Sequence, residues 1–401
     1  MFLGFAIPDE EMDKVFSMDN FPQVQTHKFN WNIIKGLEHL DVFNFTYISV
    51  RPIADYPIFP QKKIKKNKWF VLLGDKRIII QEIPFINSGI FKIITRFLSA
   101  LYYSLKNYHL VFNKAGVIVY SVHVPYMIVG LIISKIYNID YIAIWTDPPA
   151  VNINKSSNLK SKLRKIELMI SKCLMKKATK VIALTKYLAE DFAPGKPNLI
   201  MEGIIDVNYN NYPINKKEEE ILETFRIVYT GSLENRYGIK NIVNGFLAMK
   251  NKHGILEIYG RGNFEKELSE ISEQNNRVKY KGFVSNKEIL DIQRKADFLI
   301  NARSNDEEFV KYSFPSKTLE YMLSGTPLLT TLLPGIPEEY KEYVIILDNN
   351  SPEAIAEKLE EVIKYSSYNR NQIGLKAQKF ARTKNYINQS EKIINFLKLS
   401  M

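Results

Sequence analysis

Hydroxyl and lysine side chains gather at the predicted start of a helix in the stretch 309–329, FVKYSFPSKTLEYMLSGTPLL. The first turn of a helix exposes unpaired backbone N–H groups and a partial positive charge, so these side chains suit a phosphate. Glu320, one turn further along, suits sugar hydroxyls, and Gly325 is expected to end the helix. Ordinary capping by serine and threonine is the alternative interpretation. The polar residues of this start are Ser313, Ser316, Lys317 and Thr318.

A second candidate for anion binding is the glycine loop GSLENRYGIK, which follows the predicted strand 225–230. Gly231 permits close approach of the backbone to a ligand. Arg236 and Lys240 are placed to face an anion where the next helix begins. The loop therefore predicts a diphosphate site with Arg236 as the main ligand and Lys240 as the second.

A further turn of strand, glycine and helix begins at the predicted strand 256–259 and contains Gly260 and Gly262. A dinucleotide-binding motif would need a third glycine, and Glu265 occupies that position. We expect this loop to line a nucleotide site without being a dinucleotide fingerprint.

In the first half of the chain, two predicted strands end in polar residues. The strand 116–122 leads to His123, and the strand 141–146 leads to Asp147. In open parallel sheets, ligands bind beyond the carboxyl ends of the strands, so both residues are candidates for contacting an acceptor or a transferred group. The alternative is that His123 caps the following helix and Asp147 shapes a turn before two prolines.

The string YSFPSKTLEYMLSGTPL, with Glu320 and Gly325 at their positions, resembles the signature of the retaining glycosyltransferases of family four. It looks most like the bacterial enzymes that build capsular or exopolysaccharides. The resemblance can be followed from about Tyr229 to the C-terminus and more thinly before that. It implies the α/β GT-B fold, in which two Rossmann-like domains face each other across a deep cleft and a C-terminal helix crosses back to the first domain.

The resemblance also assigns donor contacts. A strand followed by glycine, an aromatic residue and valine holds the nucleotide base in this family, which gives that role to Val284. The family's second glutamate, which contacts the ribose, corresponds to Glu320. The remaining donor-binding residues expected on this basis are Ser232, Arg303 and Phe314.

This sequence departs from the family pattern at several positions. Ser232 and Tyr237 stand where the family often has arginine and lysine, and Tyr312 stands in place of its first glutamate. Either Glu307 or Glu308 could take over that contact, or both could be solvated loop carboxylates. The stretch 8–29, expected to be mainly a long polar loop before a helix from about Lys28 to Leu40, lacks the family's Gly-Gly pair.

A chain of 401 residues is too long for one ordinary core and suggests two domains. We expect an acceptor-binding domain over 1–205, joined by 385–401, a linker over 206–222, and a donor-binding domain over 223–384. One cysteine excludes an internal disulfide and a cysteine zinc site. The longest apolar runs are too short to span a membrane, and no signal sequence is evident, which favours a cytoplasmic enzyme.

The net charge of +12 is confined to one half of the chain. Residues 1–200 hold 27 lysines and arginines against 15 acidic residues, whereas residues 201–401 hold 28 of each. The basic runs 61–70 and 155–177 mix lysines with apolar residues, which favours peripheral contact with an anionic membrane surface over nucleic acid. A merely solvated basic face is the remaining alternative.

The resemblance to the family-four enzymes implies a retaining hexosyltransferase. It would move a sugar from a UDP- or GDP-linked donor to a lipid-linked glycan acceptor. No Asp-x-Asp pair is present, so neither a metal nor another cofactor is expected. A nucleotide-sugar epimerase or hydrolase of the same fold, and a non-catalytic partner subunit of a transferase, are the alternatives.

Overall fold

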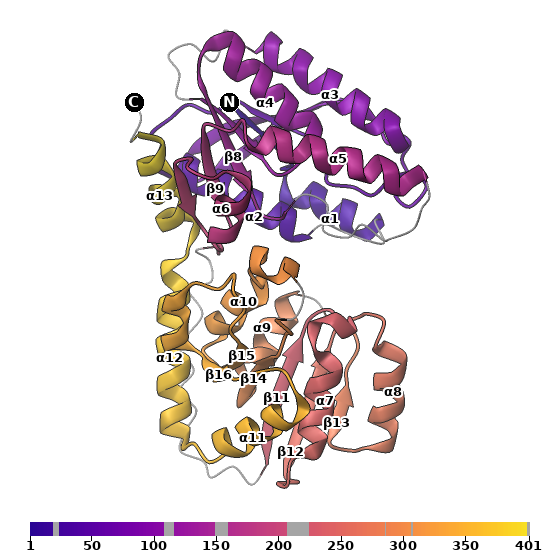
Figure 1. Cartoon of the computed structure of the whole chain (residues 1–401), viewed down its shortest axis with the longest axis vertical. Coiled ribbons are helices and arrows are strands. Elements are labelled where there is room, and N and C mark those ends of the chain that lie inside the picture. The colour runs from indigo at the N-terminus through magenta and orange to yellow at the C-terminus, as the bar shows by residue number, and fades with distance from the viewer. Residues whose placement is uncertain are drawn as a thin grey trace. The chain divides into compact units, whose positions relative to one another are not determined.

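The computed structural model describes residues 1–18, 24–107, 116–148, 159–206, 224–284, 286–305 and 308–398 (Figure 1). The chain divides into two compact units. One comprises Met1–Asp206 with Asn385–Met401, and the other comprises Val207–Lys384. The predicted first domain, 1–205 with 385–401, differs from the first of these units only at Asp206. Apart from Asp206, the predicted linker lies outside the described residues.

The first unit is built on a sheet of eight strands in the order β10-β9-β8-β7-β1-β2-β5-β4. All neighbours pair in parallel except β4 and β5, which form an antiparallel hairpin. Counted along the chain, the parallel strands run outward from β1 in both directions, as in Rossmann folds. The strands are β1 (Phe2–Gly4), β2 (Tyr47–Ser49), β4 (Asn67–Leu73), β5 (Lys76–Glu82), β7 (Gly116–Tyr120), β8 (Asp140–Trp145), β9 (Lys180–Ala183) and β10 (Asn198–Ile200); the separate pair β3 (Lys63–Ile64) and β6 (Phe85–Ile86) is antiparallel.

Helices cover this sheet, and the first of them was not expected from the sequence. Asp9–Met18 forms helix α1, where a loop was predicted. Three acidic residues in its first turn favour the helix N-terminus, and Met12 and Val15 are buried at helical spacing. Thr185 caps α6, because its side chain accepts a hydrogen bond from the Leu188 N–H (3.3 Å). The other helices are α2 (Val24–Leu40), α3 (Gly89–Lys106), α4 (Val124–Tyr137), α5 (Leu159–Met175), α6 (Lys186–Phe192) and α13 (Tyr386–Lys398).

The C-terminal helix α13 packs against α2 of the first unit. Gly36 of α2 makes the close approach possible, since a Cβ there would overlap the Ser390 side chain and the Tyr386 carbonyl oxygen. The Gln389 side chain adds a hydrogen bond to the Gly203 carbonyl oxygen (2.6 Å). The end of the chain is thus an integral part of this unit.

The second unit holds a fully parallel sheet in the order β13-β12-β11-β14-β15-β16. Its strand order corresponds to the 3-2-1-4-5-6 arrangement of Rossmann folds. Ile227, Leu256 and Phe298 are fully buried in its core. The strands are β11 (Phe225–Thr230), β12 (Gly254–Tyr259), β13 (Val278–Tyr280), β14 (Phe298–Asn301), β15 (Leu328–Thr331) and β16 (Ile345–Leu347).

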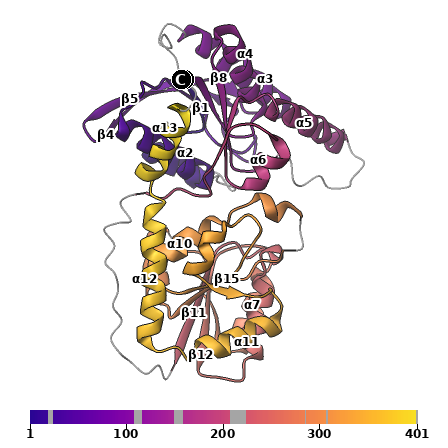
Figure 2. The same ribbon diagram turned by 60° about the vertical axis from the view of Figure 1, so that its left-hand side comes forward.

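The helices of the second unit can be followed in Figure 2. Ser351 caps α11 through a hydrogen bond from the Ala354 N–H (3.2 Å). Gly325 ends α10 in the left-handed conformation, as predicted. The elements are η3 (Asn235–Tyr237), α7 (Ile239–Ala248), α8 (Glu265–Gln274), α9 (Asn286–Arg294), η4 (Glu308–Tyr312), α10 (Ser316–Ser324), η5 (Glu338–Tyr343), α11 (Pro352–Val362) and α12 (Ser367–Thr383).

Within the described part of the chain, we find no helix with the length and apolar character needed to cross a membrane.

Gly36→Ala should lower the free energy of unfolding by about 1–3 kcal/mol, because the added methyl group forces α13 away from α2. In an isolated helix the same change would be favourable by about 1 kcal/mol, so the sign of the effect is diagnostic. Urea unfolding of the full chain measures it. His39→Ala, at an exposed position of the same helix, is the control and should change stability by less than about 0.5 kcal/mol. Equal stability of the two variants would contradict the packing described here.

Candidate functional site

The strand order of the second sheet reverses between β11 and β14, which are neighbours. In open α/β sheets, a crevice forms at the carboxyl ends of the strands at such a switch point. Gly231 and Ser232 follow β11, and Arg303 follows β14. Three of the predicted donor-binding residues therefore lie at this point of the sheet.

Two arginines pack against one tyrosine beside the switch point. The guanidinium carbon of Arg303 lies 4.3 Å from the ring centroid of Tyr237, and that of Arg236 lies 5.0 Å from it. Burial lowers the pKa of Arg303, three nearby tyrosines oppose this shift, and the charge of Arg236 adds to it. The geometry brings two positive charges together, as an anion site requires.

Gly238 explains how η3 reaches the end of β14. Its φ of +80° is a left-handed conformation, and a Cβ at this position would overlap the carbonyl oxygen of Ala302. Only glycine allows this approach without strain. The glycine therefore positions Tyr237, and with it the two arginines.

A hydrogen-bonded chain of side chains links the end of β11 to α10. The Gln293 side-chain amide donates to Thr230 Oγ1 (2.9 Å) and to Glu320 Oε1 (2.9 Å). Lys317 Nζ also donates to Glu320 Oε1 (2.9 Å). The Tyr321 hydroxyl accepts from the Thr230 N–H (2.8 Å) and donates to its carbonyl oxygen (2.7 Å). Glu320 is thus held in a fixed orientation at the end of β11.

Several buried polar atoms in this region have no hydrogen-bond partner among the described residues. They are Nε of Arg303, Oε1 of Gln293 and Oγ1 of Thr318. Leaving such atoms unsatisfied costs about 1–3 kcal/mol each, so they are typical of sites that a ligand or water completes.

The predicted glycine loops pack against each other. A Cβ at Gly260 would overlap the carbonyl oxygen of Gly231, and a Cβ at Gly262 would collide with the backbone of Leu233. The Leu233 N–H donates to the Arg261 carbonyl oxygen (2.9 Å). These glycines therefore have a packing role that is independent of any ligand.

The remaining predicted donor residues have mixed surroundings. Lys240 forms an ion pair with Glu267 of α8 (2.8 Å) on the surface. Ser316 is exposed at the start of α10, and Val284 is half-buried in the loop after β13. Phe314 is buried against Tyr340, with ring centroids 5.4 Å apart.

Ser313 and the acidic candidates remain to be placed. The Ser313 hydroxyl donates to the Val310 carbonyl oxygen (3.3 Å). Tyr312, in place of the family's first glutamate, ends η4. Glu307 and the side chain of Glu308 lie outside the described residues.

Sequence reasoning missed Gln293, which is fully buried and connects Thr230 to Glu320. A glutamine within the apolar pattern of a helix was the available signal, but it does not reveal the partners. Sequence reasoning also identified Tyr237 only as a departure from the family pattern. In the structure, the guanidinium groups of Arg236 and Arg303 both pack against its ring.

In the first unit, His123 and Asp147 lie beyond the carboxyl ends of the neighbouring strands β7 and β8, as expected from the sequence. The His123 ring meets Phe5 and Tyr126 edge-to-face, with centroids 5.0 Å apart in both pairs. His123 is the N-cap residue of α4, but its side chain makes no capping hydrogen bond. Two aromatic rings thus pack against the imidazole.

Burial and charge set the ionisation of these two residues. Burial lowers the pKa of His123 well below its usual value, and the positive charges of Arg96 and Lys92 lower it further. The pKa of the Asp147 carboxyl is raised by desolvation, although the residue keeps contact with solvent and accepts a hydrogen bond from Thr146 (2.9 Å). His123 is therefore neutral at physiological pH.

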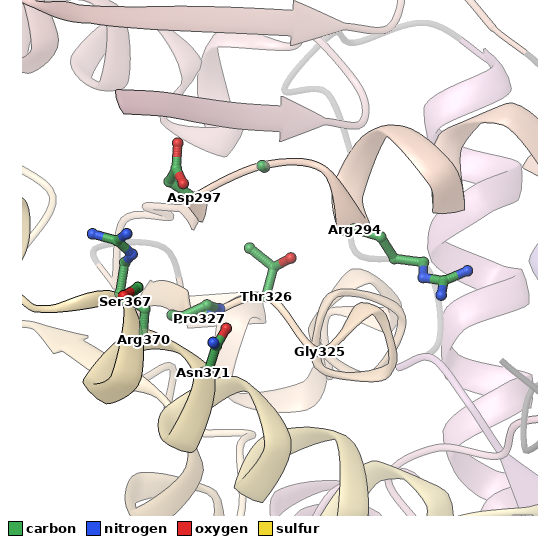
Figure 3. A pocket seen from close by; sticks show the side chains of 9 residues that line it. Arg294, Asp297, Gly325, Thr326, Pro327, Ser367, Arg370 and Asn371 are labelled. Carbon is green, nitrogen blue, oxygen red and sulfur yellow. The ribbon is translucent and has the colours of Figure 1, made fainter. Parts of the chain in front are cut away.

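A separate pocket lies at the amino ends of β14 and β15 (Figure 3). Asp297 directly precedes β14 and Pro327 directly precedes β15, so this pocket is at the opposite strand ends from the switch-point crevice. Figure 3 shows the Arg294 side chain directed away from Asp297. The other lining residues are Ala296, Gly325, Thr326, Ser367, Arg370 and Asn371.

His123→Gln should reduce the dependence of stability on pH. As pH falls through about 6.5, the unfolded chain binds a proton at His123 while the folded chain does not, so stability is lost towards acid pH. Between pH 7.5 and pH 5.5, wild type should lose about 1 kcal/mol more than the variant. Urea unfolding at the two pH values measures this difference, and parallel losses in both proteins would contradict a neutral imidazole in the folded chain.

The sequence of the second unit matches a known family. Residues 212–380 match the family described as "Glycosyl transferases group 1". A search of curated proteins gave no significant match.

Solved structures resemble the whole chain. Sucrose-phosphate synthase from Thermosynechococcus elongatus superposes with a TM-score of 0.65 and 12% identity, covering 100% of both chains. Alr3699/HepE of Anabaena, in complex with UDP, gives a TM-score of 0.57 and 14% identity over 80% of this chain and 86% of its own. An α,α-trehalose-phosphate synthase (UDP-forming) from Burkholderia xenovorans, in complex with glucose-6-phosphate, gives 0.62 and 9% identity over 99% of both chains. The chain therefore has the two-domain α/β GT-B fold, with the sequence match to group 1 glycosyl transferases over residues 212–380.

Proposed function

We propose that the chain is a retaining glycosyltransferase of the family-four type. It transfers a hexose from a UDP- or GDP-linked donor to a lipid-linked oligosaccharide or similar glycan in cell-surface polysaccharide synthesis, and it needs no metal. The observation that carries the proposal is the pairing of Arg236 and Arg303 around Tyr237 at the switch point, beside the oriented carboxylate of Glu320.

Each part of a nucleotide-sugar has a matching group. The guanidinium groups of Arg236 and Arg303, with Lys317, suit the diphosphate, because arginine offers several N–H donors in one plane. The carboxylate of Glu320 can accept hydrogen bonds from the ribose hydroxyl groups. The backbone at Val284 is assigned to the base.

The structural relatives favour UDP as the first nucleotide to test. Alr3699/HepE has been solved in complex with UDP and with UDP-glucose. A sequence identity of 14% supports a shared fold only. The assignment of a UDP-linked donor to this chain is therefore part of the proposal.

In the reaction, the bond between the anomeric carbon and the diphosphate oxygen breaks. A bond forms between that carbon and an acceptor hydroxyl oxygen, and the hydroxyl proton leaves with the diphosphate. Negative charge grows on the leaving group, and the fixed positive groups of Arg236, Arg303 and Lys317 stabilise it. His123 and Asp147 are assigned to the acceptor or the transferred sugar, where a neutral imidazole can either donate or accept one hydrogen bond.

Glu320→Gln should weaken UDP binding about tenfold or more without weakening the binding of inorganic diphosphate, because the carboxylate serves the ribose. Isothermal titration with both ligands separates the two contributions. Glu361→Gln is a matched control, since Glu361 also pairs with a lysine three residues earlier (2.7 Å), as Glu320 does. If both variants bind UDP like wild type, the ribose assignment is wrong.

Arg303→Gln should weaken UDP and inorganic diphosphate by similar factors, about tenfold or more, because it removes a charged phosphate ligand. Arg303→Lys keeps the charge and should recover part of the affinity. Thermal unfolding confirms that both variants fold. Unchanged diphosphate affinity in Arg303→Gln would exclude this residue from the donor site.

The activity itself is tested by the release of nucleotide diphosphate from a panel of nucleotide-sugars in the presence of EDTA. Release that requires a lipid-linked glycan supports the transferase. Donor turnover without acceptor would instead identify a hydrolase or epimerase. A chain that binds no nucleotide-sugar and turns none over would overturn the proposal and favour a non-catalytic partner subunit.

A further inference from the structure

Helix α3 presents its apolar side to solvent. Its sequence, GIFKIITRFLSALYYSLK, predicts an amphipathic helix, and such helices ordinarily bury the apolar face. Here the buried side chains are Arg96, Ala100 and Ser104. The exposed ones, between 41% and 62% accessible, include Ile90, Phe91, Ile94, Leu98, Tyr102 and Leu105.

The buried side of α3 accounts for this orientation. Arg96 is 6% exposed, donates to the Arg51 carbonyl oxygen (3.0 Å) and lies over the Phe85 ring, with its guanidinium carbon 4.3 Å from the ring centroid. The Ser99 hydroxyl donates to the Pro84 carbonyl oxygen (2.7 Å). These polar contacts fix the helix with its large apolar side chains outward, so the exposure belongs to the folded state.

A second apolar stripe is exposed on α5. Ile166, Met169 and Ile170 are exposed at helical spacing, and the exposed Cys173 follows one turn later. Helix α4 contacts both α3 and α5, and the three helices lie together in both views of the unit (Figures 1 and 2). We call the two stripes together the α3–α5 surface.

Positive charge accompanies the α3–α5 surface. Lys165 and Lys172 are exposed on α5, Lys176 is exposed in the turn that follows it, and Lys106 is exposed at the end of α3. The whole charge excess of the chain lies in residues 1–200. Helices that lie in a membrane interface combine these features, with apolar and aromatic side chains on one face and basic residues around it.

We propose that the α3–α5 surface docks the first unit onto an anionic lipid bilayer. The apolar side chains of α3 and α5 enter the boundary between headgroups and acyl chains, and the flanking lysines contact lipid phosphates. The sequence placed membrane contact on the lysine runs 61–70 and 155–177; this proposal assigns the main contact to the apolar face of α3. It concerns binding alone and stands independently of the proposed sugar transfer.

A bilayer fits this surface better than a protein partner does. The stripe on α3 follows a helix of 18 residues, about 27 Å long, and belongs to a row of neighbouring helices. Opposite charge attracts it to anionic lipid without requiring a shaped counterpart. A second copy of the chain would carry the same positive excess and would repel it.

Cosedimentation of the full chain with phosphatidylcholine vesicles, with and without phosphatidylglycerol, tests the proposal. Wild type should bind the anionic vesicles, with binding weakened by salt. The double variant Ile94→Ser/Leu98→Ser should bind about tenfold more weakly, because both side chains are exposed and contribute to insertion. Tyr368→Ser removes an exposed aromatic residue from the second unit and is the matched control.

Cys173, the single cysteine of the sequence, allows a direct reading of insertion. An environment-sensitive fluorophore on its thiol should shift to shorter wavelength with anionic vesicles in wild type and shift less in the double variant. Unaltered vesicle binding by the double variant, or no binding by wild type, would overturn the proposal. A wild-type dimer in sedimentation velocity that the double variant dissociates, without vesicle binding, would assign the surface to self-association instead.

Discussion

The reversal of strand order between β11 and β14 is the constraint on which the candidate donor site depends. At this point the chain connections leave to opposite sides, so the strand ends are open to a ligand. Backbone contacts hold both ends in place. Gly238 brings η3 against the carbonyl oxygen of Ala302, and the Tyr321 hydroxyl exchanges two hydrogen bonds with the backbone of Thr230. Side chains that follow such fixed strand ends need little reorganisation when charge develops in front of them.

The two units share a strand arrangement but carry different side chains at the ends of their strands. Both sheets run outward from a central strand, and both place polar residues at the carboxyl ends beside the switch point. In the second unit these residues are cationic, with Arg236 and Arg303 around one ring. In the first unit, aromatic rings and nearby positive charges keep His123 neutral. The cationic residues of the second unit suit a diphosphate. The neutral His123 of the first unit suits the hydroxyl groups of an uncharged glycan.

Local signals in the sequence were sufficient for the alternation of strands and helices, the caps at Thr185 and Ser351, and the termination of α10 at Gly325. These features depend on neighbours a few residues away. Gln293 was not predictable as a link between Thr230 and Glu320, because its partners lie 63 and 27 residues away. Helix α1 was missed because its buried positions, Met12 and Val15, are few within an acidic stretch. Glycine spacing likewise could not distinguish ligand approach from the packing of one loop on another.

The orientation of α3 shows the limit of amphipathic patterns. A pattern of apolar residues identifies a helix and its two faces, but it does not say which face meets the rest of the protein. In α3 the face with Arg96, Ala100 and Ser104 is inside, and Arg96 has its burial offset by a carbonyl oxygen and an aromatic ring. Without these partners the buried guanidinium would be costly. The fold keeps a broad apolar face outside, and because exposed apolar patches of this kind mark interaction sites, this face is the basis for the proposed contact of α3 with a lipid bilayer.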